Sequence, residues 1–180
     1  QMFNADGTKS GGVATVNQTS TGIQIAPRVA VLNDGNFVVV WNDWLSGPNV
    51  AQKFDIHAQV FSATGAPIGN EFRIANDLGV QREPEVTAAG LNGFVVSWTD
   101  ESGLVGAVPL GARDPSASVK AQYFQLAYSY DDTGAVTDAN ALASRVFQIN
   151  QVVAGPQREV SVDQLDDQTL VFSWADGSGQ

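Results

Sequence analysis

Three aspartates follow a tryptophan at the same point of a repeated sequence pattern, which makes them the polar residues best placed for a chemical role. The three segments are Phe37-Val-Val-Val-Trp41-Asn-Asp43, Phe94-Val-Val-Ser-Trp98-Thr-Asp100 and Leu170-Val-Phe-Ser-Trp174-Ala-Asp176. Ca²⁺ is bound by several oxygen ligands, and carboxylates usually supply many of them. One interpretation therefore makes the repeated aspartates calcium ligands, helped by nearby carboxylates. The candidate ligands are Asp43, Asp55, Asp100, Glu101 and Asp176.

The second interpretation of these aspartates is structural. Each would cap the turn after its tryptophan strand by accepting hydrogen bonds from backbone N–H groups. The sequence contains no EF-hand spacing and no G-G-x-G-x-D nonapeptide, the patterns of dense calcium sites. Both interpretations stay open from sequence alone. A calcium site, if formed, is expected to be weak or shared between loops, and calcium is the one cofactor under consideration.

Three further aromatic residues fall in segments that we expect to be loops, where binding side chains often lie. Trp44 lies in a stretch rich in Gly, Pro and Asn and has no counterpart in the other copies of the pattern. Tyr128 and Tyr130 lie in a second such segment. These three are the candidate ligand-binding residues, with surface glycans as the candidate ligand. The tryptophans of the repeated pattern end apolar strands instead, so they are predicted to be buried.

An enzymatic function has little support, and no catalytic residue is assigned. His57 is the one histidine, and no serine nucleophile motif accompanies it, so a catalytic triad lacks its parts. Phosphate loops, dinucleotide fingerprints and zinc spacings are missing from the sequence as well. A pair of carboxylates that converge in space would suit a glycosidase. A glycoside hydrolase fragment is therefore kept as a distant alternative.

The elements that must position these residues follow from the repeated pattern. Upstream of each tryptophan lies Gly-x-Gln and then a strand with a valine, and the copies are separated by 57 and then 76 residues. Apolar residues alternate or form short β-branched runs bounded by Gly, Asn, Asp and Pro, which indicates strands. The sequence therefore predicts an all-β protein, one domain over residues 1–180, made of three four-stranded units.

The units are expected at residues 1–43, 56–100 and 119–176, with loop insertions at 101–118 and 127–142. The strands predicted for the first two units are Met2–Phe3, Val13–Val16, Arg28–Leu32, Phe37–Trp41, Ile56–Phe61, Asn70–Ala75, Glu85–Ala89 and Phe94–Trp98. In the third unit, Val119–Leu126 and Ser144–Asn150 precede the last hairpin. Each insertion is either a binding loop or a tolerated surface addition.

Tandem four-stranded units suggest two architectures. In a β-propeller each unit is a blade of a ring that usually holds about four to eight blades. In a β-trefoil, three units complete the fold. The count favours the trefoil, but strands such as Phe37–Trp41 are apolar on both faces, as expected between stacked sheets. We therefore predict propeller-like blades, with the trefoil as the alternative.

The two ends of the chain carry complementary parts of a unit. Gln1-Met-Phe3 matches Gln59-Val-Phe61 and Gln122-Tyr-Phe124, and this is the strand that a unit ending at Trp174 lacks. Unpaired strand edges invite association with other strands. We therefore expect the N-terminal strand to pair with the third unit of another copy or with adjoining repeats of a longer chain.

The composition of the chain limits the kinds of partner it can bind and the kinds of site it can form. The chain has 180 residues, 43% of them hydrophobic, and a formal net charge of −10, with no cysteine. Nucleic-acid binding is disfavoured because a phosphate backbone needs a basic surface. No apolar run approaches the roughly 18 residues of a membrane helix, so membrane insertion is not expected. Disulfides and thiolate metal sites are excluded because the chain has no thiol.

Two segments resemble a known type of repeat. Leu32-Asn-Asp-Gly-Asn-Phe-Val-Val-Val-Trp41 resembles the L-x-D-G-G-F-V-V-x-W tandem repeat of large secreted bacterial proteins of the RTX and adhesin type. Ile56-His-Ala-Gln-Val-Phe-Ser-Ala-Thr-Gly65 resembles it too. The resemblance implies export, a secreted or cell-surface location, and an adhesive or structural role. The third copy departs most, because Asp166-Asp-Gln168 replaces the Asp-Gly turn.

We therefore predict a structural or adhesive repeat module of a secreted or cell-surface bacterial protein, with self-association or adjoining repeats as partners. The alternative is a lectin-like carbohydrate-binding module that uses the loop aromatics.

Overall fold

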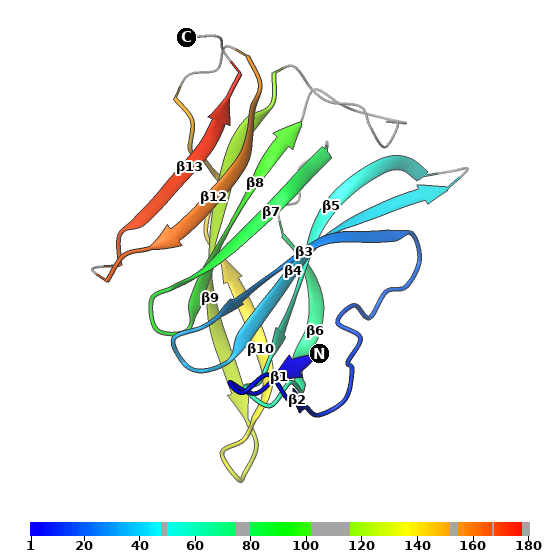
Figure 1. Cartoon of the computed structure of the whole chain (residues 1–180), viewed down its shortest axis with the longest axis vertical. Coiled ribbons are helices and arrows are strands. Elements are labelled where there is room, and N and C mark those ends of the chain that lie inside the picture. Colours follow the sequence, from blue (N-terminus) through cyan, green and yellow to red (C-terminus); the bar gives the residue numbers. More distant parts are fainter. Residues whose placement is uncertain (48–49, 75–79, 102–115, 152–154, 167, 178–180) are drawn as a thin grey trace.

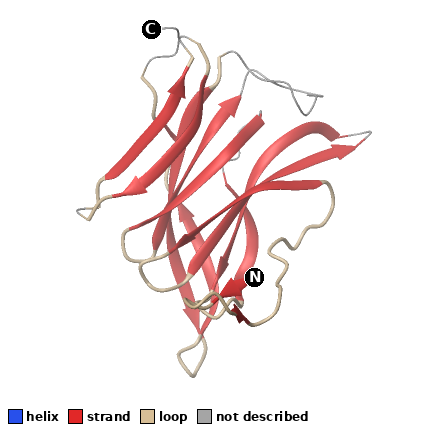
Figure 2. Cartoon of the chain, in the orientation of Figure 1, coloured by secondary structure: helices blue, strands red, loops and turns tan. Residues whose placement is uncertain are grey.

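The computed structural model describes residues 1–47, 50–74, 80–101, 116–151, 155–166 and 168–177 of the chain. This part of the chain holds thirteen β-strands and no helix. Figures 1 and 2 show the strands arranged in several sheets. The prediction of an all-β protein is therefore confirmed. Residues 102–115, most of the first expected insertion, lie outside the described residues.

Most strands belong to three antiparallel sheets. The first sheet consists of β3 (Ile23–Val31), β4 (Phe37–Gly47), β5 (Val50–Phe61) and β6 (Pro67–Ile74), in that order. The second consists of β7 (Val80–Ala89), β8 (Gly93–Glu101), β9 (Ser118–Tyr130) and β10 (Val136–Ala143), with β11 (Phe147–Gln148) also paired to β9. The third contains β12 (Gln157–Gln164) and β13 (Leu170–Asp176), and β1 (Met2–Phe3) and β2 (Lys9–Ser10) form a separate N-terminal hairpin. None of these sheets closes on itself.

The sheets divide the chain at different points from the units expected from the sequence. The first sheet joins the last two strands of unit 1–43 to the first two strands of unit 56–100, because β4 pairs with β5. The second sheet combines units 56–100 and 119–176 in the same way, through the pairing of β8 with β9. As a result, the third sheet holds only two strands in the part of the chain that the structure describes, and the N-terminal hairpin is separate from it.

Five hairpins share one turn geometry. In the Ser62–Ala66 turn, Ser62 N–H donates to the carbonyl of Ala66 and Gly65 N–H donates to the carbonyl of Ser62, both at 2.8 Å. The fourth residue of such a turn adopts a positive φ, 86° at Gly65, which glycine tolerates without a steric cost. The other turns of this geometry span Asn4–Thr8, Leu32–Asn36, Asp131–Ala135 and Leu165–Thr169.

The turn at Asp131–Ala135 overturns the expectation of a loop insertion at 127–142. This segment is a hairpin in which β9 runs on to Tyr130 and β10 begins at Val136. The acidic and small residues of the segment suggested a loop, but Gly134 supplies the positive φ that the turn needs. Val136, Ala139 and Ala141 then pack against the main core, which stabilises β10.

The predicted strand Val13–Val16 is also wrong. These residues have no strand pairing and instead line a hollow over the outer face of the first sheet, together with the N-terminal hairpin. The adjacent strand β2 is only two residues long, so it offers too short an edge for a third strand to pair with.

Neighbouring sheets pack face to face through alternating residues of their strands. Val38 and Val40 of β4 and Ile56 of β5 lie on the face of the first sheet that covers Phe94 and Trp98 of β8, and all five are fully buried. The opposite face of the second sheet packs against the third sheet, where Val95 and Ala121 contact Val162 and Phe172. The core therefore lies between sheets.

The first strand of each sheet contains the same bulge. At Ala26, Glu83 and Glu159 the backbone adopts φ values of 53°, 55° and 54°, in the left-handed region that side chains other than glycine rarely adopt. The pairing register shifts at each of these points, as expected for a β-bulge. A strained conformation that recurs at three equivalent positions indicates a shared structural requirement.

The tryptophans of the repeated pattern are not equally buried. Trp41 is 4% exposed and Trp98 is 0% exposed, as predicted, but Trp174 is 36% exposed. The prediction is therefore wrong for Trp174. The reason is that β4 and β8 each have a strand on both sides, whereas β13 is paired only with β12 among the described residues.

Candidate functional site

The glutamine and the aspartate of the repeated pattern lie directly opposite each other in every sheet. The pairs are Gln24 with Asp43, Gln81 with Asp100, and Gln157 with Asp176. In the first sheet, Gln24 Nε2 donates to Asp43 Oδ1 at 3.1 Å. In the third sheet, Gln157 Nε2 donates to Asp176 Oδ1 at 2.7 Å, and the Trp174 indole N–H donates to Gln157 Oε1 at 2.8 Å. Asp43 and Asp176 therefore hold two strand ends together through a side-chain amide, whereas the Gln81 amide has no hydrogen-bond partner among the described groups.

A second set of hydrogen bonds links each sheet to the next through the bulge residues. Glu83 N–H donates to Asn42 Oδ1 of the first sheet at 3.1 Å. Glu159 N–H donates to Thr99 Oγ1 of the second sheet at 3.3 Å. Asn42 and Thr99 are the residues between Trp and Asp in the repeated pattern. The left-handed backbone of the bulge thus directs an N–H group to the preceding sheet, which gives the strain a structural role.

Glu101 lies at the centre of a buried ion-pair network between the second and third sheets. Its Oε2 accepts from Arg82 Nε of the same sheet at 2.8 Å, and its Oε1 pairs with Arg158 of β12. Arg82 also lies over the ring of Phe54 in the first sheet, 3.9 Å from the centroid, where a cation–π attraction is expected. One carboxylate and two arginines therefore connect all three sheets.

The structure distributes the five predicted calcium ligands over three sheets. Asp43 and Asp55 lie opposite each other on β4 and β5, and Asp55 pairs with Arg73 at 3.2 Å. Asp100 pairs with Lys120 Nζ at 3.0 Å. Glu101 and Asp176 have the partners given above. Within the described residues, no group of three or more His, Cys, Asp or Glu side chains is arranged to hold a metal ion.

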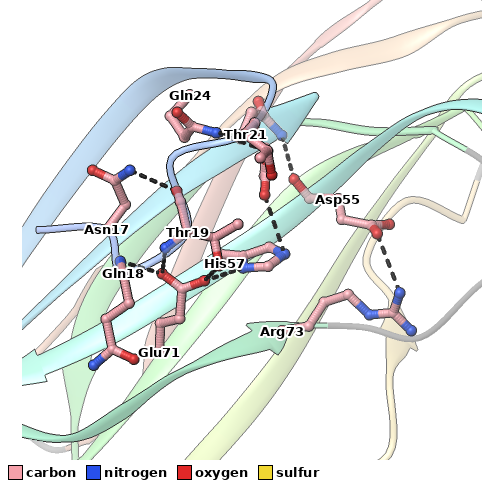
Figure 3. A network of polar contacts seen from close by, with 11 residues as sticks. Asn17, Gln18, Thr19, Thr21, Gln24, Asp55, His57, Glu71 and Arg73 are labelled. Atoms are coloured by element: carbon pink, nitrogen blue, oxygen red, sulfur yellow. Dashed lines mark hydrogen bonds and ion pairs between the residues drawn. The ribbon is translucent and has the colours of Figure 1, made fainter. Parts of the chain in front are cut away.

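His57 forms a polar cluster that the sequence did not reveal. Its Nε2 lies 3.7 Å from Asp43 Oδ2 and its Nδ1 lies 3.6 Å from Glu71 Oε1. Figure 3 shows His57 beside Glu71. The Trp41 ring lies 6.0 Å from the imidazole, centroid to centroid. The imidazole is thus held between carboxylates of β4 and β6, on the outer face of the first sheet.

Glu71 fastens the chain segment that covers this face. Its carboxylate accepts hydrogen bonds from Gln18 N–H at 2.6 Å and from the N–H and hydroxyl of Thr19 at 3.2 and 2.6 Å (Figure 3). Partial burial raises the pKa of Glu71, but these hydrogen bonds outweigh it and hold the pKa below the ordinary value. The contact joins residues more than fifty positions apart, and Glu71 sits in an ordinary strand sequence, so no local signal marked it.

The three candidate ligand-binding aromatics do not form one site. Trp44 stacks on Phe54 near the end of β4, with ring centroids 5.6 Å apart. Tyr128 and Tyr130 lie near the turn before β4, where the Tyr128 hydroxyl donates to Asp34 Oδ2 at 2.5 Å. Burial and this hydrogen bond raise the pKa of Tyr128. Of the three, Tyr130 is the most accessible, because 61% of it is exposed.

A scan against protein-family models finds no match to the chain, and a search of curated proteins finds no similar sequence. The described residues include no helix that is long and apolar enough to cross a membrane.

Proposed function

We propose that the chain is a structural or adhesive repeat module of a secreted or cell-surface bacterial protein, with sheets that act as propeller-like blades. The observation that carries this proposal is the hydrogen bond from two of the three bulge N–H groups to the sheet before, from Glu83 to Asn42 and from Glu159 to Thr99. The repeated polar positions serve contacts within and between sheets. A sequence that repeats its stacking contacts rather than a reactive group is suited to building an extended surface.

The location at the cell surface is supported by composition and by the resemblance of the repeats. An acidic exterior suits a protein that stays soluble in the extracellular medium. A net charge of −10 and the resemblance of Leu32–Trp41 to repeats of secreted proteins agree on this point. Calcium belongs to this proposal only as a weakly bound cation that carboxylates of different loops would share.

Surface display of the chain tests the proposed function. A bacterium that displays the chain should clump with its own kind or be retained on glycan-coated surfaces under flow. The matched control displays a Trp98→Ala variant, in which the core is disrupted. A displayed chain that is folded but gives neither clumping nor retention would overturn the proposal. Release of sugar from a panel of glycosides would overturn it in favour of a hydrolase.

A carbohydrate-binding module is the second candidate, and one observation favours it. The exposed Tyr130 ring lies edge-on to Tyr128 at 6.5 Å between centroids, and the Tyr128 hydroxyl is hydrogen-bonded to the Asp34 carboxylate and the Asn36 amide. An exposed aromatic ring next to polar acceptors and donors suits a sugar ring. Retention on one glycan that is lost in Tyr130→Ala, with the fold intact, would establish this candidate. Clumping that is unchanged in Tyr130→Ala would refute it.

A further inference from the structure

The free edge of β13 is the first of two features that point to a partner. Its counterparts β4 and β8 lie in the interior of their sheets, each with a strand on both sides. In the described structure β13 pairs with β12 alone. The counterpart strand β8 is buried along its whole length, whereas Val171 of β13 is 47% exposed. An exposed edge with apolar side chains is a template for another strand.

The second feature is the N-terminal hairpin, which has the missing half of such a sheet. Gln1-Met-Phe3 matches Gln59-Val-Phe61 of β5 and Gln122-Tyr-Phe124 of β9. Strands β5 and β9 each pair with a tryptophan strand on one side. Strand β1 pairs only with β2 within the described residues. It lies over the first sheet, and Figure 1 shows it well apart from β13 of the same chain.

The outer face of the first sheet lacks part of its cover. The hairpin and residues 11–16 enclose a hollow of about 660 Å³ against Phe37, Phe61 and Val29. Val29 is 63% exposed, whereas its counterpart Val162 in the third sheet is 8% exposed because the second sheet covers it. The neighbouring apolar residues of β3 that are also exposed are Ile23, Ile25 and Val31. A two-stranded segment placed beside β1 would cover this part of the face.

We propose that a second copy of this chain supplies that segment, so that β12 and β13 of one copy join β1 and β2 of the next into one four-stranded sheet. The register follows from the first sheet, in which Phe37, Val38 and Val39 face Phe61, Val60 and Gln59. By the same pattern, Leu170 lies opposite Phe3, Val171 opposite Met2, and Phe172 opposite Gln1 of the next copy. A four-stranded sheet formed in this way pairs the free edge of β13 with the free edge of β1 and covers the exposed residues of β3.

The contact joins different surfaces of the two copies. It is therefore heterologous, and it produces either a closed ring or an open filament. The inference rests on the proposed structural function, for which it names the partner.

One residue makes this junction weaker than those inside the chain. Asn42 accepts from the Glu83 N–H, and Thr99 accepts from the Glu159 N–H together with the Glu83 carboxylate. The residue in the position of Asn42 and Thr99 in the third sheet is Ala175. Alanine has no side-chain oxygen, so Ala26 N–H of the next copy gains no such bond. Ala175→Thr, which copies Thr99, should therefore tighten the association by about 2- to 10-fold in Kd, the typical effect of one net hydrogen bond.

Cysteine cross-linking tests the register directly, because the chain has no cysteine of its own. Val171→Cys and Met2→Cys are made in separate chains of different size and mixed under mild oxidation. Directly opposed residues of antiparallel strands lie within the Cα separation that a disulfide needs. The mixed dimer should therefore form faster than either homodimer. Ala175→Cys mixed with Met2→Cys is the matched control, since it displaces the cysteine by four residues along the same face, roughly 13 Å.

Sedimentation of the unmodified chain over a range of concentrations provides the second measurement. The sedimenting mass should exceed that of a monomer. Val29→Glu should reduce this mass, whereas Leu91→Glu, an exposed change in the turn between β7 and β8, should not. A chain that stays monomeric, with mixed cross-linking no faster than in the control pair, overturns the inference. If such a monomer still promotes retention of the displaying bacteria, the proposed function stands without this interface. If the chain associates as expected but displayed cells neither clump nor are retained, the interface stands and the proposed function fails.

Discussion

Truncation of Trp98 is the most direct test of the stacked sheets. The Trp98 side chain is fully buried in the cluster between the first and second sheets. A tryptophan buries roughly 200 Å², and about 25 cal/mol per Å² gives about 5 kcal/mol for its removal. Alanine retains a small share of this burial, so we expect Trp98→Ala to lower the free energy of unfolding by about 4 kcal/mol.

Trp174→Ala is the matched control, because Trp174 occupies the equivalent position but is 36% exposed. About two-thirds of the area is lost there and the edge strand can relax, so a loss of about 2 kcal/mol is expected. Trp98→Phe is the second control. Trp98 Nε1 has no hydrogen-bond partner among the described groups, so phenylalanine removes a buried donor while it keeps most of the ring. Its loss should be less than half that of alanine.

Urea unfolding followed by far-ultraviolet circular dichroism measures these differences without depending on tryptophan fluorescence. The m-value should be unchanged if only stability is altered. A loss at Trp174 equal to or larger than that at Trp98 would refute the assignment of the core to the space between the sheets.

Three further predictions follow from the polar contacts. Glu101→Gln leaves two arginines without their shared buried carboxylate and should lower the free energy of unfolding by about 3 kcal/mol. A loss no larger than that of Glu85→Gln, at a more exposed ion pair, would contradict this. Millimolar calcium should change the melting temperature little relative to chelator, and a shift of tens of degrees would show that the aspartates form a metal site. Because the pKa of Glu71 is lowered from 4.5, its stabilising contacts are present above pH 4.5 and are lost as the pH falls through the lowered pKa. Amide exchange at residues 18–19, corrected for the intrinsic rate, should therefore accelerate in acid, and Glu71→Gln should remove this pH dependence.

The strands and turns could be predicted because their signals are local. Runs such as Phe94–Trp98 lie within observed strands, and the turn around Gly65 has the expected residues. The extension of β9 beyond Leu126 was missed because its alanines and polar residues are poor strand signals, and β10 gains stability by packing on the core.

Contacts between distant segments were the least predictable. The carboxylate of Glu71 meets His57 and the backbone at Gln18 only after β5 and β6 have paired and the segment before β3 has crossed them. The roles of the repeated aspartates were open from sequence because a carboxylate suits both an amide donor and a cation. The pairing of glutamine with aspartate was a signal that sequence reasoning missed, because Gln24 and Asp43 recur together in constant register. Asp43 and Asp176 accept hydrogen bonds from the glutamine opposite them.

The bulge contact gives the stack a direction. Each junction places a backbone donor on the later sheet, at Glu83 or Glu159, and a side-chain acceptor on the earlier one, at Asn42 or Thr99. A gene duplication that inserted one whole sheet in register would therefore present matching partners at both of its new boundaries. The length of such a protein can change by recombination in steps of one sheet, with no need for the existing junctions to adapt. Insertions that break the register would leave a bulge N–H without its acceptor, so selection should preserve the phase of the repeat more strictly than the number of copies.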